Sequence, residues 1–167
     1  MNAEVIRDLY RYHFWVNDLL MAEVSKLSAE QTQQRFGASF DSILGTIAHL
    51  ASAENFWLSR WRGTAPSQLP SAENGASVDE ILAGWHDVRK DLQGFLDGLT
   101  DEQVASQIRW ENRTGKSFSL PLWEPMFQVV NHGTHHRSEL CEMLTRLGFP
   151  PPTTDAMAYF QQRTGQG

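Results

Sequence analysis

The sequence contains one cysteine and few positive charges, and each shortage excludes a class of protein. Cys141 stands alone among 167 residues, so an intramolecular disulfide and a metal site built from several thiolates are both excluded. The chain has 14 Lys and Arg against 20 Asp and Glu, and this net charge of −6 argues against a broad nucleic-acid-binding surface. Any metal in this protein would therefore be held by histidine and carboxylate side chains.

Long apolar runs are missing as well. No stretch of about 18 apolar residues occurs, so we expect no membrane span. The first ten residues include Glu4, Arg7 and Asp8, which a signal peptide would not carry in its apolar region. With 41% hydrophobic and 20% charged residues, the composition is that of a folded chain rather than a disordered one. We therefore expect a single cytoplasmic domain over residues 1–167.

Helical periodicity is what the sequence does contain. Apolar residues spaced three and four apart predict long amphipathic helices, over residues 2–27, 41–61, 77–99 and 122–147. Three segments have the pattern of a capping box, in which a Ser or Thr and a Glu or Gln three residues later satisfy each other's backbone N–H groups. They are Ser28-Ala-Glu-Gln31, Ser77-Val-Asp-Glu80 and Thr100-Asp-Glu-Gln103. Gly63 should end the second helix, and Gly148 with the prolines that follow it should end the fourth.

Two segments depart from this helical pattern. Gly63–Ser77 is rich in Gly, Pro, Ser and Ala, which predicts a loop of about 15 residues, long enough to need a reason such as covering a site or mobility. Apolar and polar residues alternate between Gln107 and Pro121, around a turn at Asn112-Arg-Thr-Gly115, which predicts a short β-hairpin. Asp155–Gln162 should form a last short helix. Together these elements favour an all-α four-helix bundle with a hairpin-like excursion before the last long helix.

The segment Asn131-His-Gly-Thr-His-His-Arg137 is the one best suited to carry chemistry. His132 and His136 are four residues apart, about 40° around a helix, so their imidazoles could converge on one ion. His132 and His135 could do so as well, about 60° apart in the other sense, and spacing alone does not choose between the two pairs. A third ligand must come from another helix, and His49 is the best candidate. Three histidines leave coordination positions open for water or substrate.

Several other side chains accompany this candidate site. Glu139 shares the helix face of His132 and His136, so it could orient a ligand or act as a general base. A single histidine on the inner face of a bundle, taken alone, is usually a hydrogen-bonded core residue. We expect His13 and His86 at the edge of the core or beside the site. Cys141 lies about 140° around the helix from His136, so we expect it to be a buried apolar residue. The six tryptophans should pack in the core and beneath loops.

Three motifs occur together in this chain: Tyr12-His-Phe-Trp-Val-Asn17, Ile47-Ala-His-Leu50 with Glu54 after it, and the histidine-rich segment with the Pro-rich turn that follows. On these residues the sequence resembles the DinB/YfiT-like superfamily of metalloenzymes, and the resemblance covers most of the chain. It implies an up-down-down-up bundle in which His49, His132 and His136 bind the metal and His135 lies outside. The family often continues this last motif as Arg-Gly-Gln. This chain has Arg137-Ser138-Glu139, which places a carboxylate beside the expected metal.

The resemblance also implies a kind of function. Relatives include mycothiol-dependent maleylpyruvate isomerase and bacillithiol transferases, in which a metal would lower the pKa of a cofactor thiol. We therefore expect a divalent transition metal (Zn, Ni or Fe), a small-molecule substrate or low-molecular-weight thiol, and a homodimer. Thiol S-transfer is favoured over metal-assisted hydrolysis. The alternative is a non-catalytic, stress-associated bundle that acts as a dimeric binding or assembly module. Neither nucleic acid nor a membrane is expected as a partner.

Overall fold

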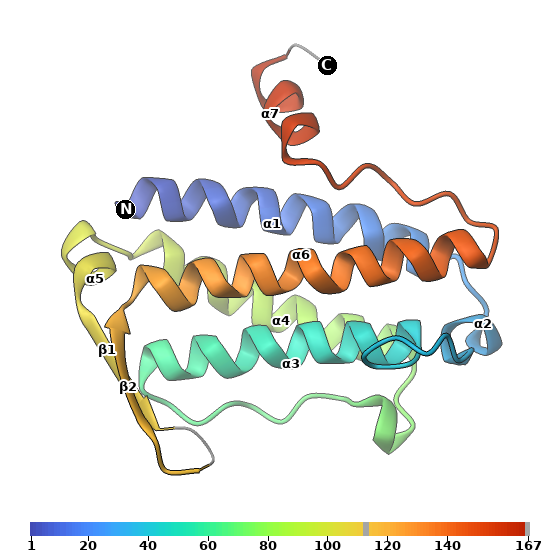
Figure 1. Ribbon diagram of the computed structural model, residues 1–167, viewed down its shortest axis with the longest axis horizontal. Coiled ribbons are helices and arrows are strands. Elements are labelled where there is room, and N and C mark those ends of the chain that lie inside the picture. Colours follow the sequence, from blue (N-terminus) through green and yellow to red (C-terminus); the bar gives the residue numbers. More distant parts are fainter. Residues whose placement is uncertain (112–113, 166–167) are drawn as a thin grey trace.

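A computed structural model describes residues 1–111 and 114–165, and most of this part of the chain is helical (Figure 1). The long helices are α1 (Ala3–Val24), α3 (Ile43–Arg62), α4 (Val78–Asp97) and α6 (Trp123–Arg146). The shorter helices are α2 (Ala29–Gln33), α5 (Asp101–Ala105) and α7 (Ala156–Thr164), with a 3₁₀ turn η1 (Ala72–Asn74). Strands β1 (Gln107–Glu111) and β2 (Ser117–Pro121) form a two-stranded sheet.

Local hydrogen bonds set where the helices begin and end. The three predicted capping boxes are all formed, at Ser28, Ser77 and Thr100. Ser42 caps α3, which begins later than expected because Asp41 has a left-handed backbone with a φ of 62°. Gly63 ends α3 in the left-handed conformation that glycine adopts most readily, as predicted.

The direction of the helices explains the long loop after α3. Helices α1 and α6 run one way, whereas α3 and α4 both run the other way (Figure 1). The connection from α3 to α4 must therefore travel back along a helix of 20 residues, which is about 30 Å long. Residues 63–77 make this return, and Asn55 on α3 holds them by hydrogen bonds to the carbonyl and hydroxyl of Ser67. The length of this loop thus follows from the topology.

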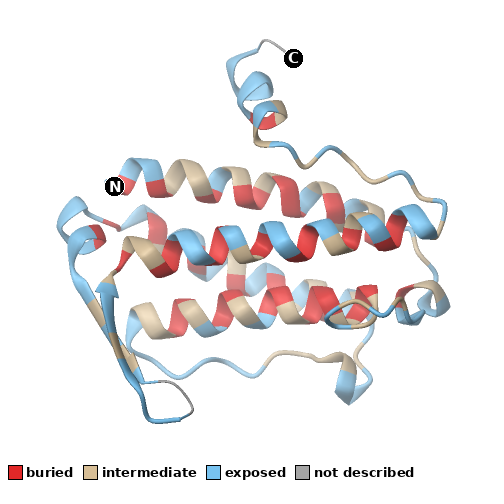
Figure 2. Ribbon diagram, viewed as in Figure 1, coloured by how far each residue is buried: buried red, intermediate tan, exposed pale blue. Residues whose placement is uncertain are grey.

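The core runs along the inner faces of the four long helices (Figure 2). It consists of two apolar clusters, one toward α2 and the other toward α5. Polar residues lie between the two clusters, among them His13, Glu54 and Arg137, each less than 5% exposed. Trp85 is buried and the other five tryptophans are half-buried. Of these five, Trp57, Trp61 and Trp123 pack against the cluster toward α5, which agrees with the expectation that tryptophans pack in the core and beneath loops. Their size leaves part of each ring in solvent.

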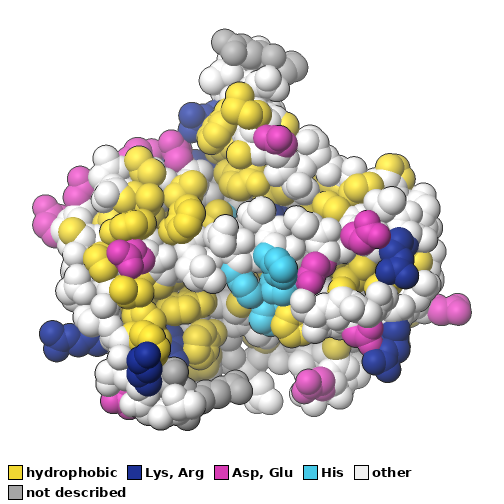
Figure 3. Space-filling view, viewed as in Figure 1, with side chains coloured by type: hydrophobic (Ala, Val, Ile, Leu, Met, Phe, Trp, Pro, Cys, Tyr) yellow, Lys and Arg dark blue, Asp and Glu magenta, His cyan; other side chains and the backbone are white. Residues whose placement is uncertain are grey.

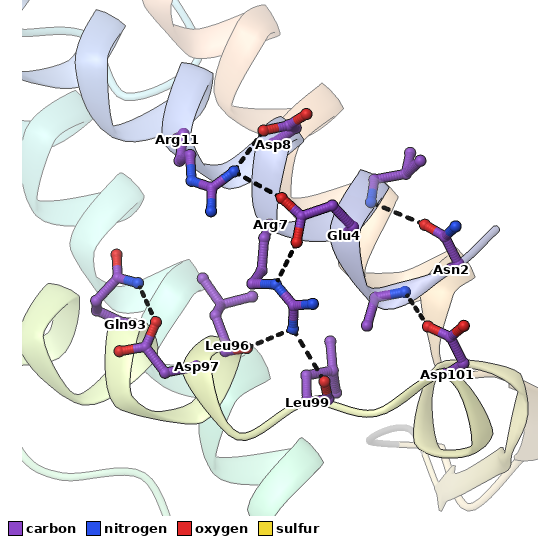
Figure 4. A network of polar contacts seen from close by, with 12 residues as sticks. Asn2, Glu4, Arg7, Asp8, Arg11, Gln93, Leu96, Asp97, Leu99 and Asp101 are labelled. Atoms are coloured by element: carbon purple, nitrogen blue, oxygen red, sulfur yellow. Dashed lines mark hydrogen bonds and ion pairs between the residues drawn. The ribbon is translucent and has the colours of Figure 1, made fainter.

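Polar contacts fasten the N-terminal end of α1 to the chain that follows α4 (Figure 4). Asp101 accepts a hydrogen bond from the backbone N–H of Ala3, 2.8 Å away. Arg7 donates to the backbone carbonyls of Leu96 and Leu99. The bond to Ala3 satisfies an N–H in the first turn of α1, which has no partner within its own helix. These contacts hold α1, α4 and α5 together at this end of the molecule.

The hairpin and the last helix complete the fold. Strands β1 and β2 pair antiparallel, with Gln107 opposite Pro121, which confirms the predicted strands. Asn112 and Arg113 of the predicted turn lie outside the described residues. Asp155 caps α7. The indole N–H of Trp15 on α1 donates a hydrogen bond to Gln162 of α7 and so connects the two helices. Across the described part of the chain, no helix is both long and apolar enough to cross a membrane.

Candidate metal centre

Three histidine side chains from two helices meet between α3 and α6, two of them half-buried and one buried. Histidine side chains gather on this face of the molecule (Figure 3). His49 comes from α3, and His132 and His136 come from successive turns of α6. Their ligand nitrogens lie within 4.8 Å of one another. Spacing left two α6 pairs open, and this cluster contains the pair four residues apart. His135 is exposed and belongs to a second group with His136 and Glu139, which meets the same distance limit.

The spacing of these nitrogens is compatible with one bound ion. Nitrogens held about 2.0–2.1 Å from an ion lie about 2.9 Å apart at a right angle and about 3.3 Å apart at the tetrahedral angle. The Nε2 atoms of His49 and His132 are 2.8 Å apart. Three imidazoles suit zinc, nickel or iron, and the site has no thiolate that would narrow the choice. The residues present therefore fit a divalent transition metal.

The protonation of two of these histidines favours metal binding. Burial, together with the neighbouring His136 and His132, lowers the pKa of His49 to about 4, although Glu139 opposes this. Burial and the neighbouring histidines also lower the pKa of His132. At neutral pH both rings are therefore uncharged. A neutral imidazole offers the lone pair that a metal ion requires.

Glu139 orients His136. Its Oε2 atom lies 2.6 Å from Nδ1 of His136, and its Oε1 atom accepts a hydrogen bond from the hydroxyl of Ser39, also at 2.6 Å. Burial alone would raise the pKa of Glu139, but the hydrogen bonds from Ser39 and His136 outweigh it and the pKa lies below the usual value. The carboxylate thus holds the proton on Nδ1 and leaves the lone pair of Nε2 of His136 available to a metal ion. Of the two roles expected for Glu139, orienting a ligand matches these contacts.

A loop segment that sequence reasoning missed packs against the cluster. We call residues 36–41 the strap. The Phe40 ring stacks on His49 with 3.8 Å between centroids, and its plane lies edge-on to His136. A side chain at Gly45 would come within 2.5 Å of the Phe40 carbonyl oxygen, so a glycine is needed where the strap meets α3. A glycine in the first turn of a helix was the sequence feature that could have indicated this close contact.

A second polar cluster lies inside the protein, and we call it the interior network. It consists of His13, Asn17, Glu54, Trp85 and Arg137, and it joins all four long helices. Arg137 donates to Nδ1 of His13 at 3.0 Å, because a guanidinium has only donors. Nε2 of His13 must then carry the proton, which it donates to Glu54 at 2.8 Å. A neutral histidine therefore bridges a buried arginine and a buried glutamate.

The structure corrects or refines the expectations for the remaining side chains. His13 is not at the edge of the core but fully buried in the interior network. His86 is exposed and lines a cavity between α1 and α4, away from the histidine cluster. Cys141 is half-buried against the apolar cluster near α2, and burial raises the pKa of its thiol. It is not among the residues that form the candidate metal groups.

Comparison with known proteins points to one family. The DinB family matches residues 1–165 of this chain. Protein DinB of Bacillus subtilis is 24% identical over 158 residues, which cover 90% of this chain and 91% of that protein. The crystal structure of a DinB-like protein from Bacillus cereus superposes with a TM-score of 0.64 at 19% identity, covering 91% of this chain and 97% of the other. The similarity to that structure concerns the fold.

Proposed function

The chain belongs to the DinB family, and on that premise we propose that His49, His132 and His136 bind one divalent transition metal ion. The observation that supports this most directly is the convergence of the three imidazoles within 4.8 Å. Glu139 supports it further, because a carboxylate on Nδ1 of a histidine is typical of metal ligands. The four long helices would form the up-down-down-up bundle of the family.

We further propose that the metal centre is that of an enzyme. When bound, the ion would supply a Lewis acid that lowers the pKa of a coordinated thiol or water. The chain's own residues have separate tasks: the three histidines bind, Glu139 holds the proton on Nδ1 of His136, and Phe40 covers one face of His49. His49 and His132 are only half-buried, and histidine side chains reach the surface on this face (Figure 3), so a small substrate can approach the cluster from solvent.

Thiol transfer is the reaction we favour, with metal-assisted hydrolysis next. The thiol would be external, because Cys141 does not reach the histidine cluster and burial raises the pKa of its thiol. In such a reaction the sulfur joins an electrophilic carbon of the substrate, the leaving group takes the bonding electron pair, and the thiol proton passes to water. The partners would be a low-molecular-weight thiol and a small electrophile, in the cytoplasm.

Metal analysis of protein purified without an affinity tag tests the site. We expect about one ion per chain in the wild type and loss of that ion in His136→Ala. The matched control is His135→Ala, because His135 is the neighbouring residue in α6 but is exposed, and this variant should keep its metal. Equal metal content in the wild type and in a variant with all three ligands changed to alanine would refute the proposal.

A non-catalytic dimeric module is the second candidate, and exposed apolar side chains favour it. Phe56 on α3 and Phe127 on α6 are 42% and 45% exposed, and packing these rings against a second copy of the chain would remove apolar surface from water. Thermal melting with and without a chelator, together with screens of thiols against electrophiles, separates the two candidates. The second function would be supported over the first by three results together: a melting temperature that the chelator does not change, no turnover in any screen, and a dimeric mass in solution.

A further inference from the structure

A cavity lies between α1 and α4, and no residue of the histidine cluster lines it. Apolar side chains of both helices line it, Phe14 and Met21 from α1 and Leu82 and Trp85 from α4. The polar side chains in its lining are Asn17, Asp18, Glu54, His86 and Arg89. The volume is about 130 Å³. A cavity of roughly 150 Å³ holds one benzene molecule, so this space suits a single small ring or a short chain.

Glu54 gives the cavity an unused hydrogen-bond acceptor. The residue is 3% exposed, and a carboxylate offers about four acceptor positions. Oε1 accepts from His13 at 2.8 Å and from Asn17 at 3.4 Å. Among the described residues, Oε2 accepts only from the indole N–H of Trp85, at 2.9 Å. One acceptor position of a buried carboxylate is therefore free for a ligand that donates a hydrogen bond.

The charges around the cavity favour a cation over an anion. Asp18 and Arg89 line it as an ion pair, so the one described Lys or Arg in its lining already has a partner. The guanidinium of Arg89 also lies 4.9 Å from the centre of the Phe14 ring, which shows that this aromatic wall accepts a positive charge. An anionic ligand would meet the Glu54 carboxylate without a free cation to offset it.

We propose that this cavity binds a small protonated primary amine. Its ammonium group donates to Oε2 of Glu54, and an apolar body of about five carbons packs against Phe14, Met21 and Leu82. A hydrogen bond between two charged groups is stronger than one between a carboxylate and a neutral hydroxyl, so the amine is preferred over an alcohol of the same shape. This site is independent of the proposed metal function.

Calorimetric titration of metal-free, chelator-treated protein tests the ligand class. The probes are cyclopentylamine, cyclopentanol and cyclopentanecarboxylate, which share one ring and differ in charge. We expect the amine to bind about tenfold more tightly than the alcohol, and the carboxylate to give no heat of binding. Equal affinity for amine and alcohol would overturn the proposal, because the cavity would then select only for apolar bulk. Absence of binding by the amine would overturn it as well.

Two variants of α4 locate the binding. Leu82→Trp fills the cavity and should abolish amine binding, whereas Ala83→Trp adds the same side chain at an exposed position and should bind as the wild type does. Glu54→Gln should remove the preference for the amine over the alcohol. If that variant fails to fold, Leu82→Trp still tests whether the amine binds in this cavity. Undiminished amine binding by folded Leu82→Trp would refute the site. Metal content measured in parallel keeps this outcome separate from that of the metal proposal.

Discussion

Replacing Gly133 with alanine tests whether the interior network is as tightly packed as the structure indicates. Gly133 lies in the middle of α6. Alanine has the higher helix propensity, so in an ordinary helix position this change would stabilise the protein by about 1 kcal/mol. A Cβ atom here, however, would lie 2.5 Å from Nη1 of Arg137 and 2.7 Å from Cε1 of His13. The structure therefore predicts an effect of the opposite sign.

The size of the effect follows from what must move. Arg137 and His13 are at most 1% exposed, so neither side chain can swing into solvent. Relieving the clash breaks the 3.0 Å hydrogen bond between them, and the loss of a hydrogen bond to a charged group together with overpacking of the core costs about 3–5 kcal/mol. After the gain in helix propensity, we expect a net loss of about 2–4 kcal/mol. In a protein of this size that lowers the melting temperature by roughly 5–15 °C.

Urea and thermal unfolding of the metal-free protein measure this loss, with Gly94→Ala as the matched control. Gly94 lies within α4, and a Cβ there would meet nothing within 4 Å. The control should therefore gain about 0.5–1 kcal/mol, as helix propensity dictates. If Gly133→Ala were as stable as the wild type or more so, the reasoning about the packed arginine and histidine would be wrong.

Two further predictions use the pKa shifts. As pH falls from about 6.5 to about 4, the metal-free protein should lose stability, because the unfolded chain protonates His49 before the folded one does. Denaturation at several pH values measures this, and His49→Gln should show a shallower dependence; an unchanged slope would count against it. The thiol of Cys141 should react with iodoacetamide more slowly than a free cysteine near neutral pH, because burial raises its pKa. Rapid alkylation of the native protein would contradict this.

Local features were predictable from the sequence, whereas contacts between distant segments were not. Ser28, Ser77 and Thr100 cap helices through bonds to neighbouring residues, so a short pattern identifies them. Helical spacing placed two histidines of one helix on a shared face, but the resemblance to a known family was needed to choose between the two possible pairs. The interior network escaped notice because its partners are far apart in sequence: Arg137 and His13 are separated by 124 residues.

The strap and the long loop show two other limits of sequence reasoning. Residues 36–41 have no helical or strand periodicity, so nothing in their pattern indicated that Phe40 would stack on His49. The loop at residues 63–77 was recognised from its composition, but its length has a topological cause. The cause is the shared direction of α3 and α4. The resemblance to a known family implied this direction, whereas spacing within one helix carries no information about it.

His136 and Arg137 are consecutive residues of α6, so their side chains leave the helix about 100° apart. His136 belongs to the histidine cluster, and Arg137 is held in the interior network. The two contacts together set how α6 is rotated about its own axis. At about 5–6 Å from that axis, a rotation of 10° moves a side-chain atom by about 1 Å. The interior network thus fixes the rotation of α6 and, with it, the direction in which His136 points. A substitution at His13 on α1 is expected to alter the metal affinity of the proposed centre through the angle of α6, although His13 is not one of its three histidines.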